Sequence, residues 1–330
     1  MTRSEAERQH FGAFHGLRDA DPADASSGAA PPAADAPLVV VVGNCQAESL
    51  RLLLASDDVR TVRLPAIHEL GADDVPLLRT LLARTDLFVS QPVGAGYRGL
   101  PLGTEELAAH LPPSARTVLV PPIRYHGLHP WHVVAHPPGL AEPDPPRAAY
   151  HDLRTLAAAL GAGSGAGSGA GASAGPASYD VVPDPAALRE LAAASVTELE
   201  RRQRLHGTVA VADLFARPSR DAMRTVNHPG NVVLAPVAAR VREAAGLASR
   251  PPGVTRPLLA GVHAPLEAPV LAALDLPGEP EPDWRIAGQA VPAAEVAAAH
   301  RAFYAARPDV VEVLVRRYAP TMRLLGLPGV

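Results

Sequence analysis

The stretch that decides the fold runs from Leu38 to Gln46 and reads Leu-Val-Val-Val-Val-Gly-Asn-Cys-Gln. Five apolar residues in a row, without alternation, predict a strand that is buried on both faces, as strands of parallel sheets are. The following residues, 47–55, carry four leucines and predict a helix. The polar residues that follow Gly43 therefore lie where a buried strand ends and a helix begins.

Strands and helices continue to alternate beyond this stretch. Further strands are predicted at 59–64, 86–90 and 117–120, and helices at 73–83 and from Thr104 to just before Pro112. This alternation is typical of right-handed βαβ crossovers and of a parallel sheet with helices on both faces. The later chain predicts helices at 185–206, 213–225, 233–248, 292–306 and 308–325. We therefore expect an α/β fold, with an open, mostly parallel sheet in the N-terminal half and a helical C-terminal half.

Two segments of biased composition suggest the domain organisation. Residues 1–36 lack apolar periodicity and predict a disordered N-terminal arm, in which Phe11 and Phe14 can dock locally. Residues 161–176 repeat Gly, Ala and Ser, cannot bury surface, and predict a flexible surface insertion. The rest, 37–330, is expected to form a single domain around this insertion.

Composition excludes several classes of protein. Hydrophobic residues make up 47% of the 330 residues and charged residues 19%, which excludes wholesale disorder. A net charge of −4 leaves no electrostatic basis for sequence-independent nucleic-acid binding. No apolar run reaches the roughly 18–20 residues of a membrane-spanning helix. One cysteine cannot form an intramolecular disulfide, so the expected location is the cytoplasm.

Cys45 is the residue with the strongest chemical signal. Ligands of open α/β folds bind outside the carboxyl edge of the sheet, where this cysteine is predicted to lie. A helix N-terminus offers N–H groups and the positive end of the helix dipole, which lower the pKa of a cysteine and favour its thiolate. Cys45 is therefore a candidate nucleophile. The alternative is that a lone cysteine is a small buried hydrophobic residue.

Two of the histidine-containing segments lie in polar surroundings. One follows the fourth strand and contains His126 and His129, so it shares the sheet edge with Cys45. The other is Asn227-His228-Pro229-Gly230-Asn231, in which Pro229 restrains His228 toward an extended conformation and the asparagines can orient its ring. From spacing alone, turn formation is the favoured explanation of either segment.

Other polar residues allow further hypotheses. Gln91 follows the third strand and can donate its amide to an oxyanion or a ligand, or cap a loop. Arg124 has the fork geometry that phosphates prefer. His126, His129 and His132 are spaced for one helix face, but Pro130 interrupts them and no cysteine or carboxylate joins at a fitting spacing. We therefore expect no metal site.

Together these motifs resemble the WcbI family, polysaccharide-biosynthesis proteins regarded as coenzyme A-binding acetyltransferases in capsule assembly. The resemblance spans residues 38–235 and rests on these segments: Gly43-Asn44-Cys45-Gln46-Ala47, Ser90-Gln91-Pro92, Tyr125-His126-Gly127-Leu128-His129-Pro130, Asn227-His228-Pro229-Gly230-Asn231. It implies a cysteine–histidine site that transfers an acetyl group from acetyl-CoA to a sugar hydroxyl.

The resemblance also implies roles for individual residues. Cys45 and Gln46 are the catalytic pair, and His228, or second His129, is the base that deprotonates the acceptor hydroxyl. The backbone of Gln46, with the side chains of Asn44 and Gln91, is expected to hold the tetrahedral oxyanion. The residues expected to bind coenzyme A are Asn44, Gln91, Arg124, His126, Asn227 and Asn231.

Two alternatives remain open at this point. A cysteine thioesterase or esterase of SGNH-like layout would use water in place of the sugar. A non-catalytic protein would hold a glycan or a nucleotide-like ligand at the same edge, with an ordinary thiol pKa at Cys45. The expected partners are the small-molecule donor and a saccharide acceptor, with self-association into a homo-oligomer and without nucleic acid or a membrane span.

Overall fold

The structure is a computed structural model that describes residues 3–21, 30–137, 139–164, 181–247 and 253–328. It confirms the α/β class. The chain, predicted as one domain over 37–330, divides into two compact units. The first unit comprises Met1–Ile123, Glu198–Arg217 and Pro229–Leu259, and the second unit comprises Arg124–Thr197, Pro218–His228 and Ala260–Val330. The backbone therefore passes between the units several times.

The first unit contains the predicted parallel sheet. Its strands lie in the order β2-β1-β3-β4, with β1 at Leu38–Val42, β2 at Arg60–Val62, β3 at Leu87–Ser90 and β4 at Arg116–Leu119. The helices of this unit are α1 (Glu5–His10), α2 (Gln46–Leu54), α3 (Asp74–Leu82), α4 (Thr104–Ala108) and α7 (Asn231–Ala244). Short 3-10 turns lie at η2 (Ile67–Glu69), η3 (Tyr97–Gly99) and η4 (Ala212–Phe215).

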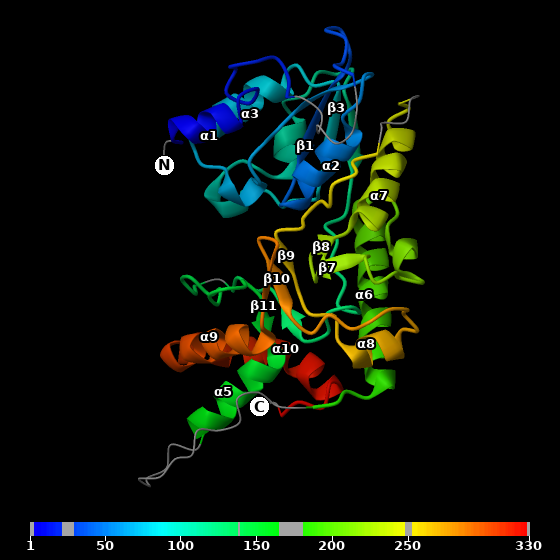
Figure 1. Cartoon of the computed structure of the whole chain (residues 1–330). Helices are drawn as coiled ribbons and strands as arrows, with labels where there is room; N and C mark the ends of the chain where they lie inside the picture. Colours follow the sequence, from blue (N-terminus) through cyan, green and yellow to red (C-terminus); the bar gives the residue numbers. More distant parts are fainter. Residues whose placement is uncertain (1–2, 22–29, 138, 165–180, 248–252, 329–330) are drawn as a thin grey trace. The chain divides into compact units, whose positions relative to one another are not determined.

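Strand β1 is apolar at every position because helices cover both faces of the sheet. Val40 and Val42 belong to a core cluster with Leu78 of α3. Val41 points the other way and lines a small cavity with Leu234 of α7. Helix α2 packs along α7 on that second face (Figure 1). Burial on both sides explains why the run does not alternate with polar residues.

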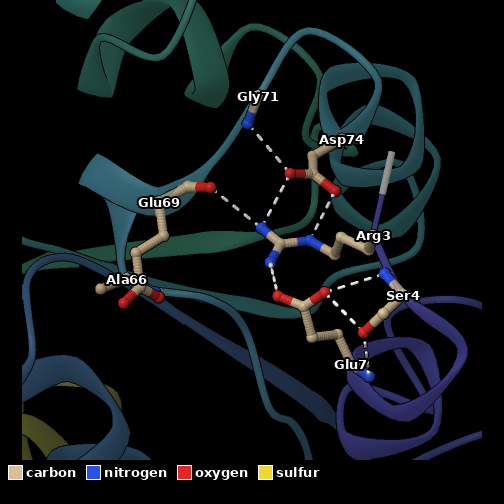
Figure 2. A network of polar contacts seen from close by, with 7 residues as sticks. All are labelled: Arg3, Ser4, Glu7, Ala66, Glu69, Gly71 and Asp74. Atoms are coloured by element: carbon tan, nitrogen blue, oxygen red, sulfur yellow. Dashed lines mark hydrogen bonds and ion pairs between the residues drawn. The ribbon is translucent and has the colours of Figure 1, made fainter. Parts of the chain in front are cut away.

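The first residues are more ordered than the predicted arm. Helix α1 begins with a capping box between Ser4 and Glu7, and Phe14 lies buried in the core of the first unit. Arg3 donates from Nε and Nη2 to the carboxylate of Asp74, at 3.0 and 2.9 Å, and this pair fixes the segment to α3 (Figure 2). Residues 22–29 lie outside the described residues.

The second unit is built from helices and very short strands. Helices α5 (Leu153–Ser164), α9 (Ala293–Ala306) and α10 (Pro308–Leu324) pack against one another, and α8 (Ala268–Ala273) is shorter (Figure 1). Three strands, β9 (Val262–His263), β10 (Trp284–Ile286) and β11 (Gln289–Val291), form an antiparallel sheet, and β5 (His132–Val133) pairs with β6 (His151–Asp152).

Strand β7 (Met223–Thr225) pairs with β8 (His228–Pro229). Helix α6 (Pro185–His206) has residues in both units. No helix within the described ranges has the length and apolarity required to cross a bilayer.

Some sequence predictions for the C-terminal half were wrong. The helix expected over 213–225 is replaced by η4 and β7, because Pro218 in this segment interrupts a helix. The strands β9, β10 and β11 were missed, since runs of two or three residues are too short to show alternation. Of the predicted insertion, residues 161–164 end α5, and 165–176 lie outside the described residues.

Candidate active site

The carboxyl ends of three strands meet at one level of the sheet. Val42 pairs in register with Ser90, and Ser90 with Leu119, so β1, β3 and β4 end together. The chain leaves β1 for β2 on one side, while β3 lies on the other side of β1. The gap between the ends of β1 and β3 is therefore a topological switch point, the place where ligands bind in open α/β sheets.

Cys45 lies at this switch point, directly before α2. Its side chain is partly exposed, and its backbone is already helical, with φ −54° and ψ −20°. Asn44 precedes it and accepts a hydrogen bond on Oδ1 from the backbone N–H of Gln46 at 2.9 Å, which caps the helix. The thiol therefore stands at the positive end of a nine-residue helix, an environment that favours a thiolate.

Two buried glutamines tie the strand ends together. The amide of Gln46 donates to the carbonyl of Ile123 at 2.8 Å, and its Oε1 accepts from the N–H of Ile123 at 3.0 Å. Gln91 donates to the same Oε1 at 3.2 Å and accepts from the N–H of Asn44 at 2.9 Å. Each glutamine thus positions the loop that carries Cys45, and the predicted oxyanion roles of Gln46 and Gln91 stay predictions.

Gly43 is required by the close approach of Gln91. A Cβ atom at Gly43 would lie 2.7 Å from Oε1 of Gln91 and 2.9 Å from its Cδ. The structure therefore explains this glycine by the lack of space for a side chain. A larger residue would displace the amide that holds Asn44.

The Asn227–His228 segment is organised by residues far away in the sequence. The hydroxyl of Tyr150 donates to Oδ1 of Asn227 at 2.9 Å and lies 3.5 Å from Nδ1 of His228. Thr225 donates to the Tyr150 hydroxyl at 2.9 Å. Tyr150 was missed from the sequence, because nothing local to it marks a partner 78 residues away.

The surroundings of His228 disfavour the charged form of its ring. It is half-buried, and burial together with Arg224 and His263 lowers its pKa to about 4. The imidazole is therefore neutral at pH 7 and able to accept a proton.

His129 and His126 are in more enclosed environments. The ring of His129 is 3% exposed, with Nδ1 at 3.0 Å from the carbonyl of Pro265 and Nε2 at 3.3 Å from that of Met223. Burial lowers the pKa of His129 to about 4, and burial together with Arg124 does the same for His126. Both ring nitrogens of His129 thus face main-chain carbonyls, and the predicted choice of His228 over His129 as the base stays a prediction.

Other predicted site residues are distributed over the two units. Asn231 begins α7 in the first unit, and its side chain binds the main chain of a nearby loop, donating to the carbonyl of Arg256 at 2.9 Å and accepting from the N–H of Leu258 at 2.8 Å. Arg124, in the second unit, is exposed. The first unit contains Asn44, Cys45, Gln46, Gln91 and Asn231, and the second contains Arg124, His126, His129, Asn227 and His228. In the described part of the chain, no cluster of three or more His, Cys, Asp or Glu residues is arranged to hold a metal ion.

Comparison with known proteins identifies the family. The family model of the polysaccharide biosynthesis enzyme WcbI matches residues 38–250, a range that includes every site residue predicted above. The chain belongs to the WcbI family. The resemblance inferred over 38–235 is thereby confirmed, and the WcbI family is a family of polysaccharide biosynthesis enzymes. A comparison with curated protein sequences finds no match.

A solved structure of WcbI shares the fold. It aligns with a TM-score of 0.71 and 19% sequence identity, covering 88% of this WcbI-family chain and 97% of the other. That protein is described as a novel polysaccharide biosynthesis enzyme, in its native form without a disulfide bond between coenzyme A and one of its cysteines.

Proposed function

We propose that this WcbI-family chain is a coenzyme A-dependent acetyltransferase that acetylates a sugar hydroxyl in polysaccharide biosynthesis. The observation that carries the proposal is the partly exposed thiol of Cys45 at the N-terminus of α2, beside the switch point of the sheet. Membership of a family of polysaccharide biosynthesis enzymes supports a saccharide acceptor. The solved WcbI structure is described as a form without a disulfide bond between coenzyme A and a cysteine, so coenzyme A is named in connection with that protein, which supports coenzyme A as the carrier here.

In the first step, the thiolate of Cys45 attacks the carbonyl carbon of acetyl-CoA. The new Sγ–C bond gives a tetrahedral oxyanion, and its collapse breaks the bond to the sulfur of coenzyme A, which leaves as a thiolate. Asn44 is our donor to the oxyanion, because its Oδ1 is engaged by the N–H of Gln46 while its Nδ2 carries two N–H groups. Acetyl-Cys45 is the product of this step.

In the second step, the sugar hydroxyl attacks acetyl-Cys45. Neutral His228 takes the hydroxyl proton as the C–O bond forms, and the bond between carbon and Sγ breaks to restore the thiolate. The pKa of about 4 keeps His228 unprotonated at neutral pH. Tyr150, through its contact with the ring of His228, positions the imidazole.

The test is the intact mass of the protein after brief incubation with acetyl-CoA and no sugar. We expect a gain of about 42 Da, one acetyl group, on the wild type and none on Cys45→Ala. Calorimetry with coenzyme A checks that Cys45→Ala still binds the carrier. His228→Gln is expected to form acetyl-Cys45 at a near-normal rate and to fail at transferring it, because the base acts in the second step.

Three outcomes would contradict the proposal. Coenzyme A binding without an adduct would indicate direct transfer. An adduct that water removes rapidly, with no transfer to saccharides, would indicate a thioesterase. Affinity for coenzyme A without any turnover, unchanged in Cys45→Ala, would indicate a binding protein.

A further inference from the structure

The second unit contains a polar cavity that the mechanism above does not use. Its volume is about 420 Å³, within the range of roughly 300–1,000 Å³ that small-molecule sites occupy. Its polar and aromatic lining consists of His132, Asp152, Arg154, Thr155, Glu267, Trp284 and His300. Proline and alanine side chains and Val296 form the rest of the lining. All of these residues belong to the second unit.

An arginine flanked by two carboxylates forms one wall of this cavity. Arg154 pairs with Asp152 at 2.8 Å and with Glu267 at 2.9 Å, and its guanidinium lies 4.8 Å from the ring centre of Trp131. Burial raises the pKa of Asp152, but the charge of Arg154 outweighs it, so that the pKa is lowered and the carboxylate stays ionised. With His132 and His300 neutral, the wall carries one net negative charge, two carboxylates against one guanidinium.

Two buried histidines line the cavity, each with an unsatisfied nitrogen. His132 and His300 are each 1% exposed. Nε2 of His132 lies 3.7 Å from a carboxylate oxygen of Asp152, and Nε2 of His300 lies 3.2 Å from the carbonyl of Ala148. Nδ1 of both rings has no hydrogen-bond partner within the described residues. A buried polar atom without a partner is costly, and a bound ligand that offers hydroxyl groups would remove that cost.

We propose that this cavity binds a neutral sugar ring of the saccharide acceptor. A sugar hydroxyl both donates and accepts hydrogen bonds. It can therefore donate to the carboxylates, accept from the guanidinium, and do either with the two neutral imidazoles. Trp284 also lines the cavity, where it is 3% exposed and contacts His132 edge-on at 4.8 Å. The net negative charge disfavours a phosphate-bearing ligand such as coenzyme A. Because it names the acceptor, this inference rests on the proposed function.

The chain carries its own reporter for this cavity. It has two tryptophans, Trp131 and Trp284, and the first lies against Arg154 while the second lines the cavity. We would titrate the full chain with glucose, galactose and mannose in turn and follow tryptophan fluorescence. The expected result is a saturable change with at least one of these sugars and no such change with coenzyme A.

Variants locate the response at the cavity. In His300→Gln the glutamine amide can still reach the carbonyl of Ala148, so the second unit should still fold. The substitution removes the nitrogen equivalent to Nδ1, so the variant should bind the sugar at least tenfold more weakly. Asp152→Asn should weaken binding in the same way. The matched control is Glu281→Gln, which removes an exposed carboxylate paired with Arg220 in the same unit and should leave sugar affinity unchanged.

The outcomes separate this inference from the proposed function. Absence of a sugar response in a wild-type chain that still forms acetyl-Cys45 would overturn the sugar site alone. A response that His300→Gln leaves intact, or a coenzyme A response that His300→Gln abolishes, would also overturn it. A cavity-dependent sugar response in a chain that forms no acetyl-Cys45 would support the sugar site and overturn acetyl transfer.

Discussion

At the scale of single residues, a glycine and two glutamines position the loop that carries Cys45. Gly43→Ala would place a methyl group 2.7 Å from Oε1 of Gln91 and push that amide away from Asn44. We predict a loss of about 1–3 kcal/mol in the free energy of unfolding, as for other overpacked buried sites. We also predict an altered rate of thiol modification. Denaturant unfolding and reaction with a disulfide reagent measure these effects, and the single cysteine makes the second assay unambiguous.

Gly94→Ala is the matched control for this prediction. Gly94 lies in the loop after β3, is exposed, and has nothing within 4 Å of an added Cβ. Its substitution is expected to change the free energy of unfolding by no more than about 0.5 kcal/mol. If Gly43→Ala behaved like Gly94→Ala in both assays, the close approach of Gln91 would have no energetic role.

At the scale of elements, an ion pair between Arg3 and Asp74 joins the segment that begins α1 to α3. Arg3→Ala would remove the guanidinium that donates to the carboxylate of Asp74 at 3.0 and 2.9 Å (Figure 2). Asp74 is 5% exposed, and among the described residues its carboxylate would keep the hydrogen bond from the N–H of Gly71. We predict faster hydrogen exchange over α1 and a decrease of about 1–3 kcal/mol in the free energy of unfolding. Hydrogen-exchange mass spectrometry of the intact chain measures the first quantity.

Arg8→Ala provides the comparison within the same helix. Its pair with Glu5 is exposed at both ends, and such pairs contribute little to stability because water and salt screen them. Exchange over α1 should therefore change little in Arg8→Ala. Equal exchange in Arg3→Ala and wild type would show that the helix is held by Phe14 and its apolar neighbours alone.

At the scale of the whole molecule, the two units should differ in their response to acid. The second unit buries His129, His132 and His151, and burial lowers the pKa values of these rings to about 4, 3 and 3. In the unfolded chain each has a pKa of about 6.5, so below that pH the unfolded state binds protons that the folded state does not. Each ring then removes up to about 1.4 kcal/mol of stability per pH unit, until the pH falls to its folded pKa.

We therefore predict that the second unit loses stability as the pH falls from about 6.5 toward 4, while no loss from these histidines occurs above 6.5. The carboxylates Glu48 and Asp74 of the first unit have lowered pKa values, although burial by itself would raise them, because their arginine partners dominate. Their contribution is lost only at lower pH. Since Trp131 and Trp284 both belong to the second unit, tryptophan fluorescence during denaturation reports on that unit.

A histidine variant checks the origin of this pH dependence. In His151→Gln, unfolding of the second unit between pH 6.5 and 4 should take up about one proton fewer than in the wild type. The free energy of unfolding should therefore change less steeply with pH. A fluorescence transition whose midpoint does not move between pH 7 and 5 would refute the prediction.

The sequence by itself determined the local architecture of the first unit. Three consecutive segments were predicted correctly: β1 from the apolar run 38–42, the Cys45 loop from the polar residues after it, and α2 from the leucine-rich stretch. Such predictions succeed because burial on both faces and helical periodicity depend on residues that are close in the sequence. The bounds of α6 and α10 were also predicted to within one residue. The placement of Gln91 at the same sheet edge follows from the rule that parallel strands end together.

Only the tertiary structure decided which partner each polar side chain takes. Gln46 bonds to Ile123, 77 residues away, and Tyr150 contacts His228 across 78 residues. The separation into two units and the cavity that joins His132 with His300 were equally invisible in the sequence. The physical reason is that an amide, a hydroxyl or an imidazole accepts many partners and imposes no period on its neighbours. Which partner binds is decided only in the folded state, where burial excludes water as an alternative hydrogen-bond partner.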